Sequence, residues 1–124
     1  MEFSLKRVGD MNLHYFESKA DSPIQLIFTP GVLGPEVWRH QLRYFSKKFD
    51  TIAYNTTFSN RSFDDQMKAL ETVISQENVE NAVLIGQGPG NSLVQAFEED
   101  EDVVWTLLSS VQDDFRSFPK ELYG

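Results

Sequence analysis

The sequence predicts an α/β fold, in which helices cover both faces of a mostly parallel sheet of about six strands. Short apolar runs, typical of strands buried on both faces, recur along the chain. They alternate with segments whose apolar residues repeat with the period of a one-faced helix. This alternation calls for right-handed crossovers between parallel strands, so the expected architecture is a three-layer α/β sandwich. With 124 residues, 40% of them hydrophobic, we expect one domain over residues 1–124.

Turn-forming residues separate the expected strands. Residues 3–8 and 13–16 are the arms of a hairpin whose turn is Gly9-Asp10. After a break at Asp21-Ser22-Pro23, the apolar run 24–28 is the next strand. The remaining strands are expected at 51–54, 82–85 and 103–108.

Helical periodicity follows three of these strands. Downstream of Glu36, four apolar residues fall on one helical face: Trp38, Leu42, Phe45 and Phe49. Ser62 followed by Asp65 is similar to a capping box and predicts a helix start. The face expected to be buried in that helix carries Phe63, Met67, Leu70 and Ile74. A third helix is expected around Leu93, Val94 and Phe97.

Charge and composition exclude several functions. The net charge of −8 argues against a nucleic-acid partner, which needs clustered Lys and Arg. The chain has no cysteine, so disulfides, thiolate metal sites and a cysteine nucleophile are excluded. Its first residues lack the apolar core of a signal peptide, and no apolar run is long enough to span a bilayer. We therefore expect a cytoplasmic protein with no membrane association and no cofactor.

Two glycine-containing segments follow expected strands. Gly86-Gln87-Gly88-Pro89-Gly90 closes the strand 82–85 and precedes a helix, as in the nucleophile elbow G-x-S-x-G, with Gly88 in the central position. Phe28-Thr29-Pro30-Gly31 ends the strand 24–28 and is followed by Gly34 and Trp38. Arg61-Ser62 closes a third segment, 53–62, and the strand 103–108 comes after the elbow helix.

In this order, these features resemble the N-terminal half of the α/β-hydrolase superfamily, from about Met11 to Val111. The resemblance implies the strand order 1-2-4-3-5-6 and an oxyanion region at Gly31 and Val32, of which the Val32 N–H would be the donor. Pro30 stands where the family usually has histidine, and Asn55, Phe58 and Asn60 also depart from its pattern. The family continues with two further strands that carry the acid and the histidine, and this sequence ends before both.

The chemistry of a serine hydrolase is incomplete in this sequence. Gly88 offers no hydroxyl, although a glycine easily keeps a strained strand-to-helix turn. Ser59 and Ser92 have no evident base. We expect His14 to lie far from the carboxyl ends of the parallel strands and His40 to lie on a helix surface. We therefore expect no catalytic residue and a degenerate elbow at Gly86, Gln87, Gly88, Pro89 and Gly90.

Metal and phosphate sites are not expected either. The acidic run 98–102 lacks the spacing of a calcium loop, so we interpret it as a solvated connection. Two histidines without cysteine make a poor zinc site. The segment 86–90 lacks both the Lys-Ser/Thr of a P-loop and the third glycine of a dinucleotide-binding motif.

The strand 103–108 is expected at one edge of the sheet. Its residues include Val103, Val104, Trp105 and Leu107, with no lysine or proline to protect the edge. A second copy pairing edge to edge would cover it, giving a homodimer, although the tail 112–123 could fold back instead.

The leading hypothesis is a catalytically degenerate α/β-hydrolase-like protein that acts through self-association or by binding another protein. One alternative is an esterase-like hydrolase whose active site is completed by a partner chain. Another is a small-molecule binding module that uses the residual pocket, lined by Trp38 and Phe58.

Overall fold

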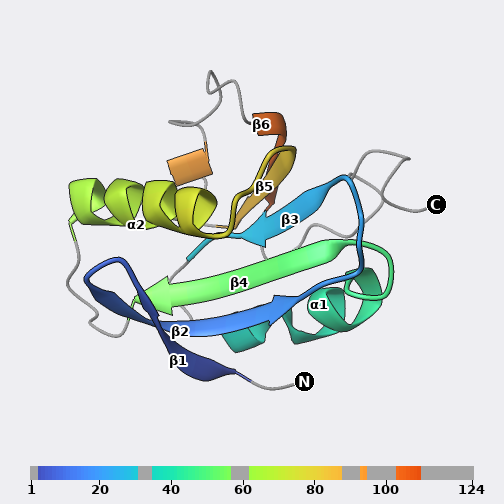
Figure 1. The fold of residues 1–124 in the computed structure, drawn as a ribbon, viewed down its shortest axis with the longest axis horizontal. Coiled ribbons are helices and arrows are strands. Elements are labelled where there is room, and N and C mark those ends of the chain that lie inside the picture. The colour runs from blue at the N-terminus through green and yellow to red at the C-terminus, as the bar shows by residue number, and fades with distance from the viewer. Residues whose placement is uncertain (1–2, 31–34, 57–61, 88–92, 95–102, 110–124) are drawn as a thin grey trace.

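The structure is a computed structural model that describes residues 3–30, 35–56, 62–87, 93–94 and 103–109. Its core is a six-stranded sheet with the order β1-β2-β4-β3-β5-β6 (Figure 1), which confirms the predicted order. The strands are β1 (Ser4–Val8), β2 (Met11–Ser18), β3 (Gln25–Phe28), β4 (Asp50–Thr56), β5 (Ala82–Gln87) and β6 (Val103–Ser109). The pairs β1–β2 and β2–β4 are antiparallel, and all other neighbours are parallel. The predicted hairpin and mostly parallel sheet are thus confirmed.

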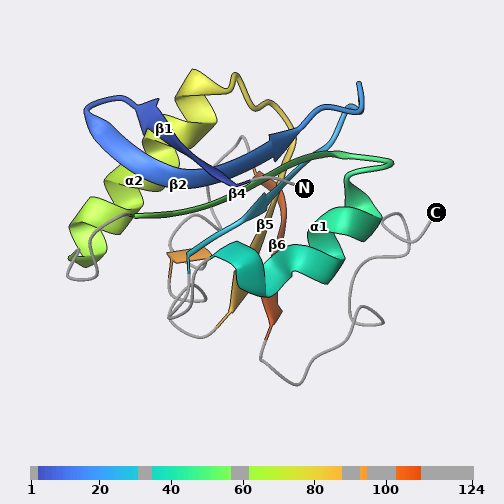
Figure 2. The ribbon, with the colours of Figure 1, turned by 90° about the horizontal axis from the view of Figure 1, so that it is seen from below.

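Helices cover both faces of this sheet (Figure 2). A 3₁₀ turn, η1 (Pro35–Trp38), leads into α1 (Arg39–Phe45) on one face, and α2 (Phe63–Gln76) packs on the other. Trp38, Leu42, Phe45 and Phe49 are all buried, as their spacing predicts. The helix itself ends earlier than Phe49, however. A turn after Phe45 brings Phe49 back to the core, with the Phe49 N–H 2.9 Å from the Phe45 carbonyl oxygen.

Helix α2 begins where the sequence predicts. The Asp65 N–H donates to Ser62 Oγ at 3.1 Å, and the Ser62 N–H donates to Asp65 Oδ2 at 3.4 Å, which completes the capping box. The predicted face is confirmed at Leu70, which is buried, and at Met67 and Ile74, which pack partly buried against the same cluster. Ala69 and Val73 are also buried, whereas Phe63 is 49% exposed and lies outside the buried stripe.

Two apolar clusters lie on the two faces of the sheet. Alternate residues of β3 and β5 enter each cluster, since both strands are covered on both sides. The cluster beneath α2 contains Ile27 and Leu84, and the cluster beneath α1 contains Phe28 and Ile85. In the described part of the chain, no helix is both long enough and apolar enough to cross a bilayer.

Candidate functional site at the carboxyl edge of the sheet

One residue links β3 to β5 by hydrogen bonds near their carboxyl ends. Thr29 directly follows β3, and its side chain is buried. Its N–H and its Oγ1 hydroxyl both donate to the carbonyl oxygen of Ile85, each at 2.9 Å. Buried hydroxyls with a backbone acceptor hold local geometry tightly. The starting points of the two predicted site loops are therefore fixed to each other, although Gly31 and Val32 themselves lie outside the described residues.

Strand β5 extends into the predicted elbow. Gly86 and Gln87 lie opposite Leu108 and Ser109 of β6, two residues beyond the end of the predicted strand. Gly88, Pro89 and Gly90 are outside the described residues, so the elbow remains a prediction. Leu93 and Val94 are helical and buried in the cluster beneath α2. In the described part of the chain, Leu93 is the first helical residue after β5.

Trp38 belongs to the core beneath α1. Its ring centroid lies 5.0 Å from that of Phe28, and only 6% of the residue is exposed. Phe58, the other predicted pocket residue, lies outside the described residues. The pocket that would use both remains a prediction.

Tyr54 places a hydroxyl in the interior near the end of β4. Within the described ranges, this buried hydroxyl has no hydrogen-bond partner. Burial raises the pKa of Tyr54, because the ionised phenolate would lose its hydration. The ring lies 6.4 Å from that of Tyr15 in β2. A buried hydroxyl that stays neutral and has no hydrogen-bond partner lowers the stability of the fold. The sequence pattern of β4 does not predict this unpaired hydroxyl.

The expected position of His14 is wrong. His14 lies opposite Asn55, next to the last residue of β4, and therefore close to the carboxyl end of that strand. Its Nε2 is 3.2 Å from Oε1 of Glu36 in η1. His14 lies at this end of β4 because the antiparallel pairing aligns the first half of β2 with the last half of β4. A histidine–carboxylate pair thus lies on the side of the sheet covered by α1. His40 is exposed on α1, as expected.

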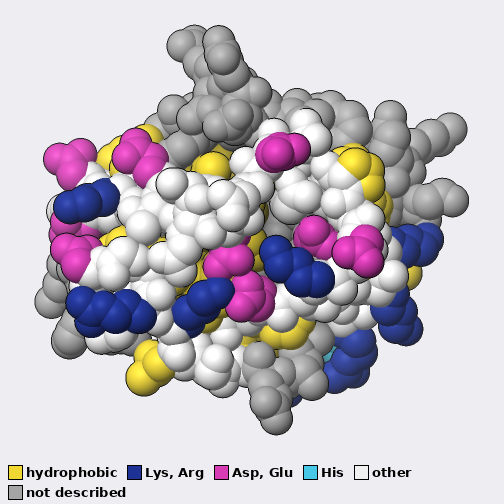
Figure 3. Space-filling model, in the orientation of Figure 1, with side chains coloured by type: hydrophobic (Ala, Val, Ile, Leu, Met, Phe, Trp, Pro, Cys, Tyr) yellow, Lys and Arg dark blue, Asp and Glu magenta, His cyan; other side chains and the backbone are white. Residues whose placement is uncertain are grey.

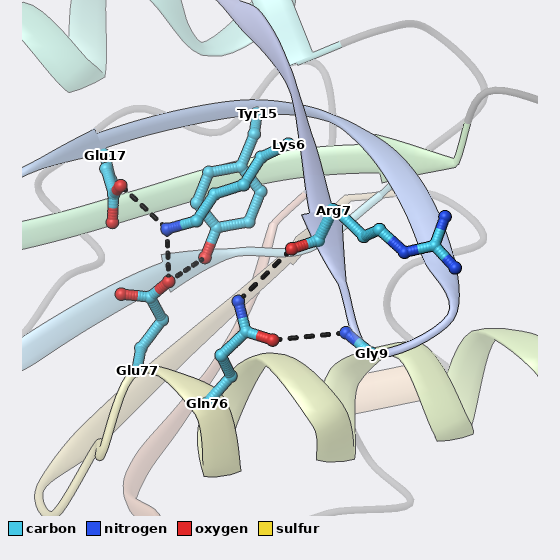
Figure 4. A network of polar contacts seen from close by, with 7 residues as sticks. All are labelled: Lys6, Arg7, Gly9, Tyr15, Glu17, Gln76 and Glu77. Carbon is cyan, nitrogen blue, oxygen red and sulfur yellow. Dashed lines mark hydrogen bonds and ion pairs between the residues drawn. The ribbon is translucent and has the colours of Figure 1, made fainter.

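A second polar network fastens the hairpin to the end of α2 (Figure 4). Lys6 Nζ contacts Glu17 Oε1 at 2.8 Å and Glu77 Oε1 at 2.6 Å, and Tyr15 donates its hydroxyl to Glu77 at 3.3 Å. Partial burial alone would raise the pKa of Glu77, but the Lys6 ammonium outweighs burial and lowers it. These contacts are structural, because they hold the hairpin over α2.

The amide of Gln76 completes this attachment. Its nitrogen donates to the Arg7 carbonyl oxygen at 3.3 Å, and its oxygen accepts from the Gly9 N–H at 3.1 Å.

Within the described ranges, no three metal-ligating side chains come together, here or elsewhere.

The polar features near this edge that sequence reasoning missed are the Thr29 contact, the buried Tyr54 hydroxyl and the His14–Glu36 pair. A polar residue directly after an apolar strand could have singled out Thr29, since such positions lie at the ligand-binding edge of α/β sheets. The other two depend on strand register across some forty residues, which periodicity does not reveal.

Comparison with known proteins bears on the fold. No family model and no curated protein matches the sequence. Among solved structures, DbjA is similar with a TM-score of 0.71 and 23% identity over 90% of this chain and 42% of that chain. An epoxide hydrolase of the α/β-hydrolase superfamily from metagenomes of hot environments has a TM-score of 0.72 and 18% identity, over 89% of this chain and 43% of its own. The haloalkane dehalogenase DbeA from Bradyrhizobium elkani has a TM-score of 0.70 and 18% identity, over 89% and 42%.

The chain spans less than half the length of each of these three proteins. Their likeness extends over nearly all of this chain, and the strand order is the one that the resemblance implies. The chain therefore has an α/β-hydrolase-like fold that corresponds to part of those longer proteins.

Proposed function

We propose that this chain is a catalytically degenerate α/β-hydrolase-like protein that acts through association. The observation that carries the proposal is Gly88, the central residue of the segment 86–90 that continues from β5. In hydrolases of this fold, the corresponding turn presents the nucleophile at the carboxyl edge of the sheet. A glycine supplies no nucleophilic atom, so acyl transfer through this turn has no first step.

The position of β6 supports self-association as the mode of action. It pairs with β5 on one side and is the last strand in the sheet order. The strand is rich in apolar residues, among them Val103, Val104, Trp105 and Leu107. An edge of this composition favours pairing with another strand. A second copy related by a two-fold axis would continue the sheet through two antiparallel β6 strands.

The test is the mass of the protein in solution, measured by light scattering coupled to gel filtration, with an ester-hydrolysis assay on the same sample. A dimer without turnover above background supports the proposal. A strict monomer at micromolar concentration contradicts self-association. Turnover that is lost on Ser92→Ala or Ser59→Ala contradicts the degenerate site.

Two matched variants locate the interface. Val104→Lys and Leu5→Lys each add one positive charge to a different edge strand, β6 or β1. A lysine within an edge strand opposes strand pairing, so Val104→Lys is expected to yield monomers while Leu5→Lys remains dimeric. The reverse result would assign the interface to β1.

A second candidate is an esterase-like active site completed by a partner chain. It is favoured by the double hydrogen bond from Thr29 to Ile85, which keeps the ends of β3 and β5 together. A neighbouring reading frame that encodes strands with the acid and the histidine of this fold would supply the partner. Ester hydrolysis that arises only when the two purified chains are mixed would establish this candidate in place of the first.

A further inference from the structure

The exposed side of α1 carries an unusual concentration of positive charge. Residues 37–49 contain four of the eleven lysines and arginines and none of the nineteen acidic residues. The other seven cationic side chains share the rest of the chain with all nineteen carboxylates, a net charge of −12 there. The protein is therefore acidic overall but not on this face.

The basic face is defined by Arg39, His40, Arg43, Tyr44, Lys47 and Lys48, all of which are exposed. Residues four apart are neighbours on a helix surface, so Arg39 lies beside Arg43, and His40 lies beside Tyr44. The two lysines continue the same side into the turn that follows α1. In Figure 3, Lys and Arg side chains gather along the right-hand edge, on the side where α1 lies in Figure 1.

Internal ion pairing does not account for three of the four cations. Among the described residues, no ion pair reaches Arg39, Arg43 or Lys47, whereas Lys6 contacts two carboxylates. Arg39 instead lies over the ring of Phe3, 5.9 Å from its centroid.

Helix stability accounts for these charges only in part. Arg43 lies in the last turn of α1, where the helix dipole favours a cation. Arg39 occupies the first position of α1, where the dipole disfavours a cation, and it lies four residues before Arg43 on the same side. The placement of Arg39 therefore weakens an isolated helix.

We infer that the basic face of α1 is a docking surface for an acidic segment of a partner protein. Charge complementarity identifies the chemistry, and Tyr44, 48% exposed among the cations, adds an apolar contact of the kind that is enriched in protein interfaces. This inference is independent of the degenerate active site and of pairing through β6.

The overall charge favours a short acidic segment over a larger polyanion. At physiological salt, electrostatic interactions are screened beyond about 8 Å. A peptide lying along α1 meets the cations of the basic face, with Glu36 and Asp50 flanking residues 37–49 in the sequence. A membrane surface or a long nucleic acid extends well beyond this distance, and it would also meet the acidic remainder of the molecule.

The experiment measures binding of a fluorescein-labelled peptide of about ten glutamates to the full chain by fluorescence anisotropy, at about 50 and 200 mM NaCl. Wild-type protein is expected to bind with an affinity that falls as salt rises. The double variant Arg43→Gln/Lys47→Gln is expected to bind about 10-fold more weakly, since two exposed charge contacts are lost.

The matched control is Lys19→Gln/Lys68→Gln. It changes the net charge by the same amount through two exposed lysines outside the basic face. Its binding is expected to change by less than about 2-fold. Far-ultraviolet circular dichroism establishes that both variants are folded. Equal weakening in the two variants, or no binding by the wild type, would overturn the inference.

Anionic vesicles with phosphatidylserine and a single-stranded oligothymidylate are measured in parallel. If either one binds the wild type more tightly than the peptide and loses binding in Arg43→Gln/Lys47→Gln, the acidic-segment assignment is wrong. If neither competes with the peptide, the assignment stands.

Discussion

Two neighbouring tyrosines are expected to respond in opposite directions to the same substitution. In Tyr54→Phe, the hydroxyl that is removed is buried and has no partner within the described ranges. Burying a hydroxyl without a hydrogen bond costs about 1–3 kcal/mol in protein mutational data. Because phenylalanine keeps the ring and its packing, we expect the free energy of unfolding to rise by about 1 kcal/mol.

Tyr15→Phe is the matched control. The Tyr15 hydroxyl donates to Glu77 at 3.3 Å, and its ring lies 6.4 Å from that of Tyr54. Losing this long hydrogen bond to a carboxylate is expected to lower the free energy of unfolding by about 1 kcal/mol. For a chain of this size, each change corresponds to a shift of about 3–5 °C in Tm.

The assay is urea denaturation followed by tryptophan fluorescence, with the free energy of unfolding extrapolated linearly to water. The slope against urea should be the same in all three proteins, so that midpoints can be compared directly. A loss of more than about 1 kcal/mol in Tyr54→Phe would refute the reasoning, because it would mean that the hydroxyl makes a strong hydrogen bond in solution.

Three further substitutions test other parts of the structure. Thr29→Val removes the hydroxyl bond to Ile85 but keeps the N–H bond, and should lower the free energy of unfolding by about 1 kcal/mol in the same urea assay, whereas Thr29→Ser should lose less. Gly9→Ala forces a side chain onto φ +62°, with its Cβ 2.9 Å from Thr72 Cγ2, and should cost about 1–2 kcal/mol. Thermal melts should show this penalty shrinking in a Thr72→Ser background; an unchanged penalty would refute the clash. Because the pKa of Glu77 is lowered in the folded state, its contribution to stability is complete above its ordinary pKa of 4.5 and is lost as the pH falls through the folded value. In acid titrations followed by circular dichroism, Glu77→Gln should therefore flatten the loss of stability below about pH 4.5, and an identical acid transition in both proteins would contradict the assignment.

Much of the fold follows from local patterns. Gly9-Asp10 marks the hairpin, the run 82–85 marks β5, and Ser62 with Asp65 marks the first turn of α2. Each of these signals needs only a few consecutive residues, because turn geometry, strand burial and helix capping are local properties. The order of the strands came instead from resemblance to a family, since local patterns do not say which strands are neighbours.

The rest depends on contacts between distant residues or on weak boundaries. Lys6 and Glu77 meet across 71 positions, and His14 reaches the carboxyl edge only through its register with β4. Helix α1 ends at Phe45 without a glycine or proline to mark the end, and its start has no side-chain cap. Neither the network nor this boundary has a signature within a short window of sequence.

The position of β3 has a consequence for how the chain folds during synthesis. This four-residue strand lies between β4 and β5, and 56 positions separate Thr29 from the Ile85 carbonyl that anchors it. On the ribosome, the hairpin β1–β2 can form early, whereas one side of β3 has no partner until β5 has left the exit tunnel. A nascent chain that is arrested before residue 82 therefore exposes an apolar strand edge at the centre of the future sheet. Such intermediates are ready substrates for chaperones that bind extended hydrophobic segments.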